Sequence, residues 1–171
     1  MNKRLGVVII LVVATFLAGC NGQIGGYEPA SSISVNGFAR DEKIRDIEGQ
    51  EVRIWGFVDH ANLYGDESAK EILEDWWSGD GPDATTWRFN LKAREDDEAG
   101  QSFPVYVPND EGRDDLLKAF VADARAGKLT RVFLMGTIFT FDAPTNTVRL
   151  TGLYMELQSS HDILLEPPEE R

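Results

Sequence analysis

The order of the predicted strands and helices constrains the fold of this chain more than any other feature of its sequence. In residues 52–58 a period of two puts Val52, Ile54 and Val58 on one face with Gly56, and residues 87–93 alternate between apolar and polar side chains. Both patterns are typical of a β-strand with a buried face. Three further strands are expected, at 103–107, 131–141 and 147–157. The sequence therefore predicts a mainly β fold.

A helix is expected at about 110–126, between the third strand and the fourth. Acidic residues crowd its first turn, and Gly127 is a good terminator. One face of this helix is apolar and is expected in the core, at Leu116, Leu117, Phe120, Val121 and Ala124. A second helix is expected at 66–77, where apolar residues recur at helical spacing, among them Ile72, Leu73 and Trp76.

This order of elements, within about 110 residues, resembles the five-stranded OB barrel. The resemblance covers Ile47 to about Leu157 and includes the OB-fold lipoproteins of bacterial envelopes, among them those likened to tRNA-anticodon-binding domains. It implies a five-stranded Greek-key barrel with a helix between strands three and four, in a domain at 47–165. Gly56 and Gly136 lie in mid-strand, where a small barrel needs a tight bend or a bulge. Another small β-barrel and a split α+β sheet are the alternative folds.

The N-terminal residues have the pattern of an export signal. Lys3 and Arg4 precede an apolar run from Leu5 to Phe16, which is shorter than the about 20 residues of a membrane span. The run leads into Leu17-Ala18-Gly19-Cys20, which resembles a bacterial lipobox. The resemblance implies that residues 1–19 are removed and that Cys20, the only cysteine, carries a covalent lipid as a stable membrane anchor. An ordinary secretory signal is the alternative.

The same resemblance places the protein in a bacterial cell envelope. Asn21 follows the lipidated position where an Asp favours inner-membrane retention in enterobacteria, so the outer membrane, facing the periplasm, is expected. Residues 20–46, rich in Gly and Ser, are expected to form a flexible tether that holds the domain clear of the lipid. A short strand or a helical turn at 32–38 or 41–47 is the alternative within this segment. Residues 166–171 form an acidic, proline-rich tail.

Composition excludes several classes of function. The formal net charge of −12 disfavours binding to nucleic acid, whose phosphates an acidic protein repels. One cysteine excludes an internal disulfide and a Cys-rich zinc site. The acidic clusters, 95–98 and Asp80 with Asp83, lack the spacing of a calcium loop and are interpreted as solvated turns. No spacing typical of a catalytic triad is present, so we expect neither an enzyme nor a metal site.

A candidate ligand site lies on the predicted second and third strands. Alternation places Arg88, Asn90 and Lys92 outward on one strand and Tyr106 outward on the next. OB barrels usually bind ligands on this face. The four residues would suit an anionic or carbohydrate ligand, or an acidic segment of another protein. A solvated strand face is the alternative, since outward strand residues are polar by default.

Aromatic residues are expected on both faces of the strands. Trp87 fits the barrel interior. Trp55 and Phe57 share the opposite face of the first strand, as a second set does in the fourth strand, namely Phe133, Phe139 and Phe141. Burial through a bulge that shifts the phase is the favoured interpretation of these five residues, and a partner surface is the alternative.

His161 raises a second hypothesis. The segment Ser160-His161-Asp162, followed by Pro167-Pro168-Glu169, resembles the C-terminal segment of the cytochrome c maturation haem chaperones. In that family the His holds haem covalently on the surface of an OB domain. Ile163 and Leu164 depart from the family pattern, and no Tyr follows as an axial ligand. A surface His beside a capping Asp is the alternative.

The sequence as a whole predicts a lipid-anchored binding or adaptor module of the envelope that engages a protein or a glycan at the membrane surface. Apart from the lipid on Cys20, no cofactor is expected. The alternative function is a small-ligand carrier, such as a haem carrier that uses His161.

Overall fold

The computed structural model describes residues 22–60, 85–144 and 149–168. Cys20, the helix expected at 66–77 and the acidic pair Asp80 and Asp83 lie outside these residues. Within the described residues, no helix is both long enough and apolar enough to cross a membrane.

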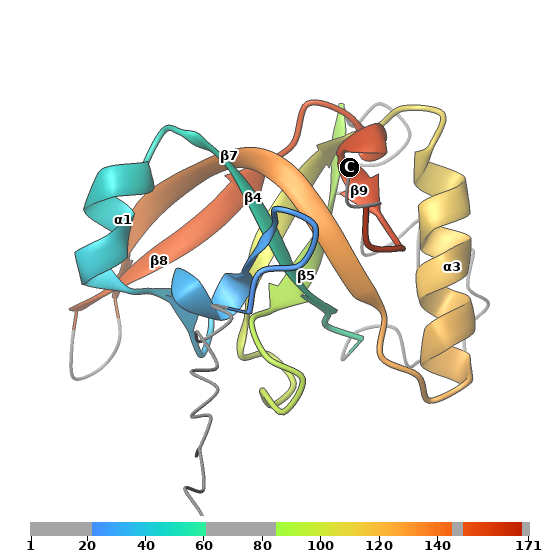
Figure 1. Cartoon of the computed structure of the whole chain (residues 1–171), viewed down its shortest axis with the longest axis horizontal. Coiled ribbons are helices and arrows are strands. Elements are labelled where there is room, and N and C mark those ends of the chain that lie inside the picture. Colours follow the sequence, from blue (N-terminus) through green and yellow to red (C-terminus); the bar gives the residue numbers. More distant parts are fainter. Residues whose placement is uncertain (1–21, 61–84, 145–148, 169–171) are drawn as a thin grey trace, which may run out of the picture.

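Five long strands close into a ring (Figure 1). They are β4 (Glu51–Val58), β5 (Thr86–Lys92), β6 (Ser102–Pro108), β7 (Arg131–Pro144) and β8 (Arg149–Glu156). β4 pairs antiparallel with β5 and with β7, β5 with β6, and β7 with β8. A parallel pair between β6 and β8 completes the ring. The prediction of a mainly β fold is confirmed.

The core fills the inside of this ring because alternate strand residues point inward. On β5 and β6 the inward residues are all buried, namely Trp87, Phe89, Leu91, Phe103, Val105 and Val107. The interior position predicted for Trp87 is therefore confirmed. At Gly56 and Gly136 neighbouring backbones approach closely. A Cβ there would lie 2.7 Å from the carbonyl oxygen of Lys92 and 2.5 Å from that of Glu156, respectively.

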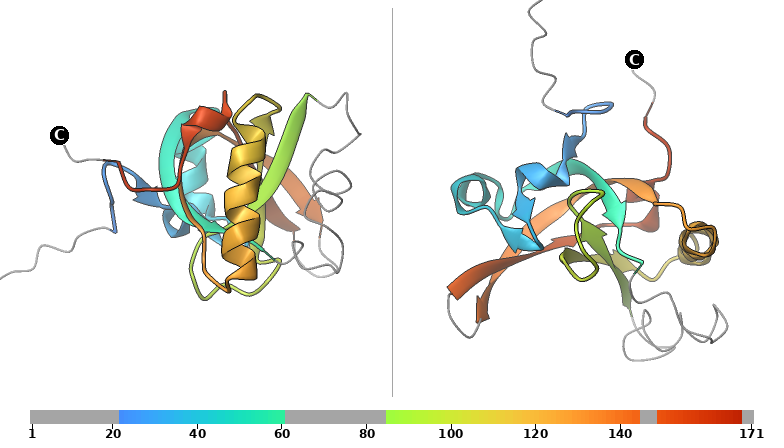
Figure 2. Two further views of the ribbon diagram at one scale, coloured as in Figure 1. Left: turned by 90° about the vertical axis from the view of Figure 1, so that its right-hand side faces the viewer. Right: turned by 90° about the horizontal axis from the view of Figure 1, so that it is seen from below.

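Helix α3 (Arg113–Arg125) packs across one end of the ring (Figure 2, left). Its apolar face is buried, with Leu117, Phe120, Val121 and Ala124 in the core and Leu116 packed against it. The sequence predicts that this helix begins at about Asp110. It begins later because the Asp110 carboxylate accepts the backbone N–H of Gly112 and forms a turn there.

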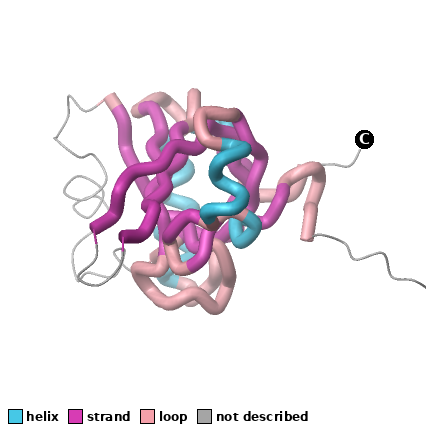
Figure 3. The backbone as a smooth tube through the Cα atoms, turned by 90° about the vertical axis from the view of Figure 1, so that its left-hand side faces the viewer, coloured by secondary structure: helices cyan, strands magenta, loops and turns pink. Residues whose placement is uncertain are grey.

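The prediction of a flexible tether is wrong for most of residues 20–46, because the described part of this segment folds onto the ring. The alternative of short strands and a helical turn is the one that the structure shows. The segment contains β1 (Glu28–Pro29), η1 (Ala30–Ser32), β2 (Ser34–Val35), β3 (Phe38–Ala39) and α1 (Asp41–Ile47). β1 pairs with β4 and β3 with β8, while α1 lies at the end of the ring opposite α3 (Figures 1 and 3). Ala30, Ile33 and Ile44 belong to the core. The folded domain thus begins well before Ile47.

The C-terminal residues return along the ring. After β8 the chain forms η2 (Ser160–Asp162) and β9 (Ile163–Leu164), which pairs antiparallel with β7. Pro168, in the predicted tail, lies so close to Gly25 that a Cβ on this glycine would be 2.5 Å from the proline Cγ. The two ends of the described chain therefore meet on one side of the molecule (Figure 3).

Candidate functional site

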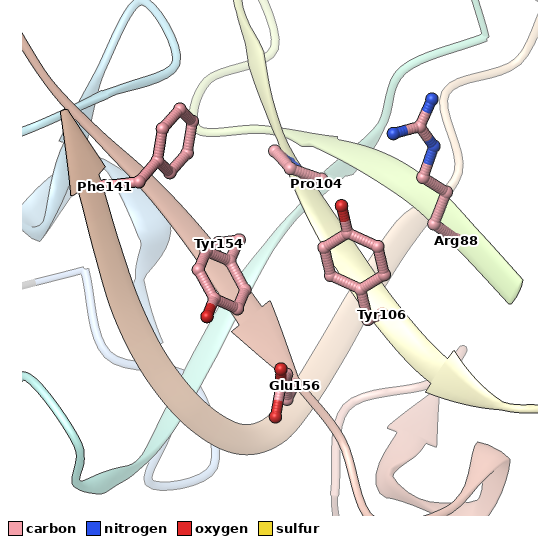
Figure 4. Close-up of a pocket in the computed structure, with 6 residues that line it drawn as sticks. All are labelled: Arg88, Pro104, Tyr106, Phe141, Tyr154 and Glu156. Atoms are coloured by element: carbon pink, nitrogen blue, oxygen red, sulfur yellow. The ribbon is translucent and has the colours of Figure 1, made fainter. Parts of the chain in front are cut away.

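A groove on the outer face of the ring is the candidate site. Its volume is about 540 Å³, and it crosses β5, β6 and β8 to the far part of β7 (Figure 4). Six residues line it, namely Arg88, Pro104, Tyr106, Phe141, Tyr154 and Glu156.

Strand register explains why these side chains meet. Val105 and Met155 face inward and are paired with each other across β6 and β8, so their neighbours in sequence face outward. Arg88 lies opposite Tyr106, and Tyr106 lies beside Glu156. A guanidinium, a phenol and a carboxylate thus form one row across three strands.

Tyr154 is the centre of an aromatic cluster next to this row. Its ring stacks on Phe139 with centroids 5.2 Å apart and meets Tyr106 edge to face at 5.7 Å. Phe141 lies 6.3 Å away and is 48% exposed. We call Tyr106, Phe139, Phe141 and Tyr154 the aromatic platform. Because it is open to solvent, it can accept a flat apolar surface of a ligand.

The groove contains two of the four residues predicted from the sequence. Arg88 and Tyr106 line it, whereas Asn90 and Lys92 lie farther along the same face and do not. The Lys92 ammonium donates instead to the backbone oxygen of Glu95, at 3.3 Å.

Sequence reasoning missed the contribution of β7 and β8 to the groove. The sequence predicts a site on the second and third strands alone, without Phe141, Tyr154 and Glu156. The alternation of Tyr154 and Glu156 with inward Met155 was a usable signal, but only the parallel β6–β8 pair shows that β8 is the neighbour of β6.

The five outward aromatic residues of β4 and β7 do not enter the core through a bulge. The β4–β7 register runs without interruption from Glu51 opposite Thr137 to Phe57 opposite Arg131. The β7–β8 register continues without a bulge past Phe139 and Phe141, so that interpretation is wrong. Phe133 is nevertheless buried, and Tyr27 of the supposed tether packs edge to face on it at 5.6 Å. Phe57 is also buried, whereas Phe141 remains open in the groove.

His161 is exposed and lies outside the groove. Its Nδ1 is 3.0 Å from the Ser159 hydroxyl oxygen. Asp162 caps the short helix η2, because its carboxylate accepts the backbone N–H groups of Gln158 and Ser159 at 3.1 and 3.0 Å. Ser159 and Asp162 thus form the cap of η2 at the end of β8, and His161 lies within that short helix.

Asp110 joins the start of α3 to the C-terminal segment. Its carboxylate accepts hydrogen bonds from the hydroxyl of Ser159 and the backbone N–H of Ser160, both at 2.9 Å, and from the Ser160 hydroxyl. Burial raises the pKa of this carboxyl. The bonds from Ser160, Ser159 and Gly112 outweigh that effect and lower the pKa of Asp110 to about 2.

A buried polar chain follows the end of β4. His60 Nε2 lies 3.0 Å from the Thr130 hydroxyl, which donates to Asp123 at 3.0 Å. Since Thr130 gives its only hydroxyl hydrogen to Asp123, we assign the donor in the first bond to His60 Nε2. Burial lowers the pKa of His60, although Asp123 and Asp59 oppose this shift, so we expect a neutral imidazole at pH 7. Among the described residues, no three His, Cys, Asp or Glu side chains are grouped to hold a metal ion.

Phe141 is positioned by a glycine on the facing strand. Gly152 lies directly opposite Phe141, and a Cβ at Gly152 would overlap the phenyl ring. We expect Gly152→Ala to push the ring away from Tyr154 and to change the free energy of unfolding by only about 1 kcal/mol, because Phe141 is free to move outward. Loss of the nuclear Overhauser contacts between Phe141 and Tyr154 would report the displacement.

The control for this prediction is a double-mutant cycle. In a Phe141→Ala background, Gly152→Ala introduces no clash with a phenyl ring. The loss of unfolding free energy caused by Gly152→Ala should therefore be smaller there, and the difference is the coupling energy between the two positions. Additive effects of the two substitutions would contradict the close packing of Phe141 on Gly152.

Comparison with known proteins gives no family for this chain. No family model and no curated protein matches it. Two solved structures are similar in part, both OBody proteins bound to hen egg-white lysozyme. The first is 18% identical with a TM-score of 0.35, over 78% of this chain and 89% of the other. The second is 16% identical with a TM-score of 0.36, over 86% and 96%. TM-scores this low do not establish a shared fold, and no function follows from them.

Proposed function

We propose that this protein is a lipid-anchored binding module of the bacterial envelope, without enzymatic activity, whose groove takes a glycan. The observation that carries the proposal is the aromatic platform, which is open to solvent and flanked by the charged groups of Arg88 and Glu156. Sugar rings present flat C–H faces that stack on aromatic side chains, and their hydroxyls accept from a guanidinium and donate to a carboxylate.

The proposal includes an OB-type Greek-key barrel. Its support is the ring order β4–β5–β6–β8–β7, with parallel pairing of β6 and β8 and with α3 between the third and fourth ring strands. OB barrels bind oligosaccharides as well as oligonucleotides on the face that includes their second and third strands. The net charge of −12 favours the oligosaccharide, because it repels a phosphate backbone.

The proposal of a lipid anchor is based on the N-terminal sequence. Lys3 and Arg4, the apolar run and the motif that ends in Cys20 support export and lipidation at the bacterial membrane. With Asn21 after the lipidated position, we place the protein at the outer membrane, facing the periplasm.

Binding to a cell-wall type oligosaccharide tests the glycan proposal. The probe is an oligomer of N-acetylglucosamine, titrated calorimetrically into the protein in detergent. We expect Tyr154→Ala to weaken binding by roughly tenfold, about 1.4 kcal/mol, because the centre of the platform is lost. Leu129→Ala, at an apolar position that is 44% exposed and does not line the groove, is the matched control and should bind normally.

Two outcomes would contradict this assignment. Equal affinity of the Tyr154→Ala and unaltered proteins would show that the sugar binds elsewhere. An absence of heat with any oligosaccharide, together with a protein crosslinked through the groove in intact cells, would replace the glycan by a protein partner.

A further inference from the structure

We propose that, once Cys20 carries its lipid, the folded domain lies directly on the bilayer with Trp55 and Arg131 at the level of the head groups, while the groove faces away from the membrane. This inference rests on the lipid anchor of the proposed function. It reverses the expectation of a tether that holds the domain clear of the lipid.

The chain is fixed to the ring from Gly22 onward. The indole Nε1 of Trp55 donates to the backbone oxygen of Gly22 at 2.8 Å. Ile24 and Tyr27 exchange two backbone hydrogen bonds of 3.0 and 2.9 Å, and Tyr27 packs on Phe133. A Cβ at Gly22 would be 3.3 Å from the Pro29 ring, so this glycine also lies against the domain.

Very little chain is left to act as a spacer. Only Asn21 separates Cys20 from Gly22, and two extended residues span about 7 Å. A flexible chain covering residues 20–46 would instead have had a root-mean-square reach of about 25–30 Å. A lipid on Cys20 would therefore be attached within about 7 Å of Gly22, the residue that Trp55 binds.

The surface beside Gly22 has the chemistry of an interfacial contact. Trp55 is partly exposed, and the exposed Arg131 places its guanidinium carbon 5.2 Å from the indole ring and 5.4 Å from Phe57. Tryptophan favours the boundary between head groups and acyl chains, and arginine pairs with phosphate oxygens.

The covalent lipid, not the charge of the protein, supplies the affinity. The net charge is −12 and becomes more negative once Lys3 and Arg4 leave with the signal, so anionic lipids repel the domain as a whole. The orientation is set by the short connection at Gly22 and should persist at high salt.

Ring order places the groove on the far side. β4, which carries Trp55, pairs with β5 and β7, so β6 and β8 lie across the ring from it (Figure 2, right). Tyr106 and Tyr154 project outward from β6 and β8. A domain that rests on the β4 side therefore presents its aromatic platform to the space beyond the membrane.

Fluorescence quenching from the bilayer surface tests this orientation. Because Cys20 is the only cysteine and is blocked by lipid, a second cysteine can be labelled specifically. Full-length lipidated protein with Gln23→Cys or Glu156→Cys, both exposed positions, is labelled and added to phosphatidylethanolamine and phosphatidylglycerol vesicles with a head-group quencher. We expect the label at 23 to lose most of its emission and the label at 156 to keep most of its own, at low and high salt.

A spacer variant provides the control. Roughly 12 Gly and Ser residues inserted between Asn21 and Gly22 add a root-mean-square reach of ~19 Å and should abolish the difference between the two labels. Equal quenching at 23 and 156 in the lipidated protein without the spacer would overturn the orientation alone. Mass spectrometry that finds Cys20 unmodified, or vesicle binding by Cys20→Ser equal to that of the unaltered protein, would overturn the lipid anchor and the orientation with it.

Discussion

Replacing Phe120 by alanine should lower the free energy of unfolding by about 3–5 kcal/mol. Phe120 is fully buried at the centre of the apolar face of α3, and its ring meets Phe89 of β5 edge to face at 5.4 Å. Truncation removes the apolar surface that attaches the helix to the ring and leaves a cavity that the rigid strands cannot close. Equilibrium unfolding in urea, followed by far-ultraviolet circular dichroism, would measure the loss.

Phe141→Ala is the matched control, since the residue type is the same and the side chain is 48% exposed. It should cost less than about 1 kcal/mol, because about half of its surface is already in contact with water. Similar losses for Phe120→Ala and Phe141→Ala would mean that α3 does not close the end of the ring.

Asp110→Asn should cost about 2–3 kcal/mol of unfolding free energy. The carboxylate accepts hydrogen bonds from Ser159, Ser160 and Gly112, whereas an amide offers one acceptor oxygen and would place an N–H₂ group against these donors. The start of α3 and the C-terminal segment would lose their common anchor. Asp114→Asn, at an exposed acid in the first turn of the same helix, is the control and should change stability little.

The same carboxylate gives stability a defined dependence on pH. Its pKa is about 2 in the folded protein against an ordinary 3.8, so the folded state binds the proton less well than the unfolded chain. The contribution of Asp110 is complete above pH 3.8 and is lost as the pH falls toward 2. Urea unfolding across this range should show a shallower acid loss in Asp110→Asn. If the unfolding free energies of the two proteins fell in parallel between pH 3.8 and 2, the lowered pKa of Asp110 would be contradicted.

The spacing of apolar residues and the residues that end helices predicted those strands and helices in which one face is buried along the whole element. β5 alternates cleanly, β4 puts Ile54 and Val58 on one face with the same period, and α3 shows helical spacing followed by Gly127, so their positions follow from local sequence. In the N-terminal segment the sequence offers short elements at 32–38 and 41–47 only as an alternative to a tether. The strands of this segment have two residues each and α1 has seven, too few to show a period, and burial of Ala30, Ile33 and Ile44 depends on a ring made by later residues.

The residues of the candidate site also fall into two groups, those that the sequence predicts and those that it does not. Arg88 and Tyr106 lie on strands that are adjacent in sequence and joined by one hairpin, so their common face could be predicted. Tyr154 and Phe141 reach the groove through the pairing of β8 with both β6 and β7. A parallel pair leaves no turn signature in the sequence, and it is the feature that sets the aromatic platform beside Arg88.

The uninterrupted β4–β7 pairing also imposes an order of folding. β4 pairs with β5 only at Phe57 and Val58, but with β7 from Glu51 to Phe57. A chain made from its N-terminus therefore produces β4 long before Arg131 begins its main partner, and such distant pairing is slow. During that interval β4 has an open edge that can pair with other chains. The N-terminal segment, which docks on β4 and Phe133, can reach its final position only after β7 has joined the ring.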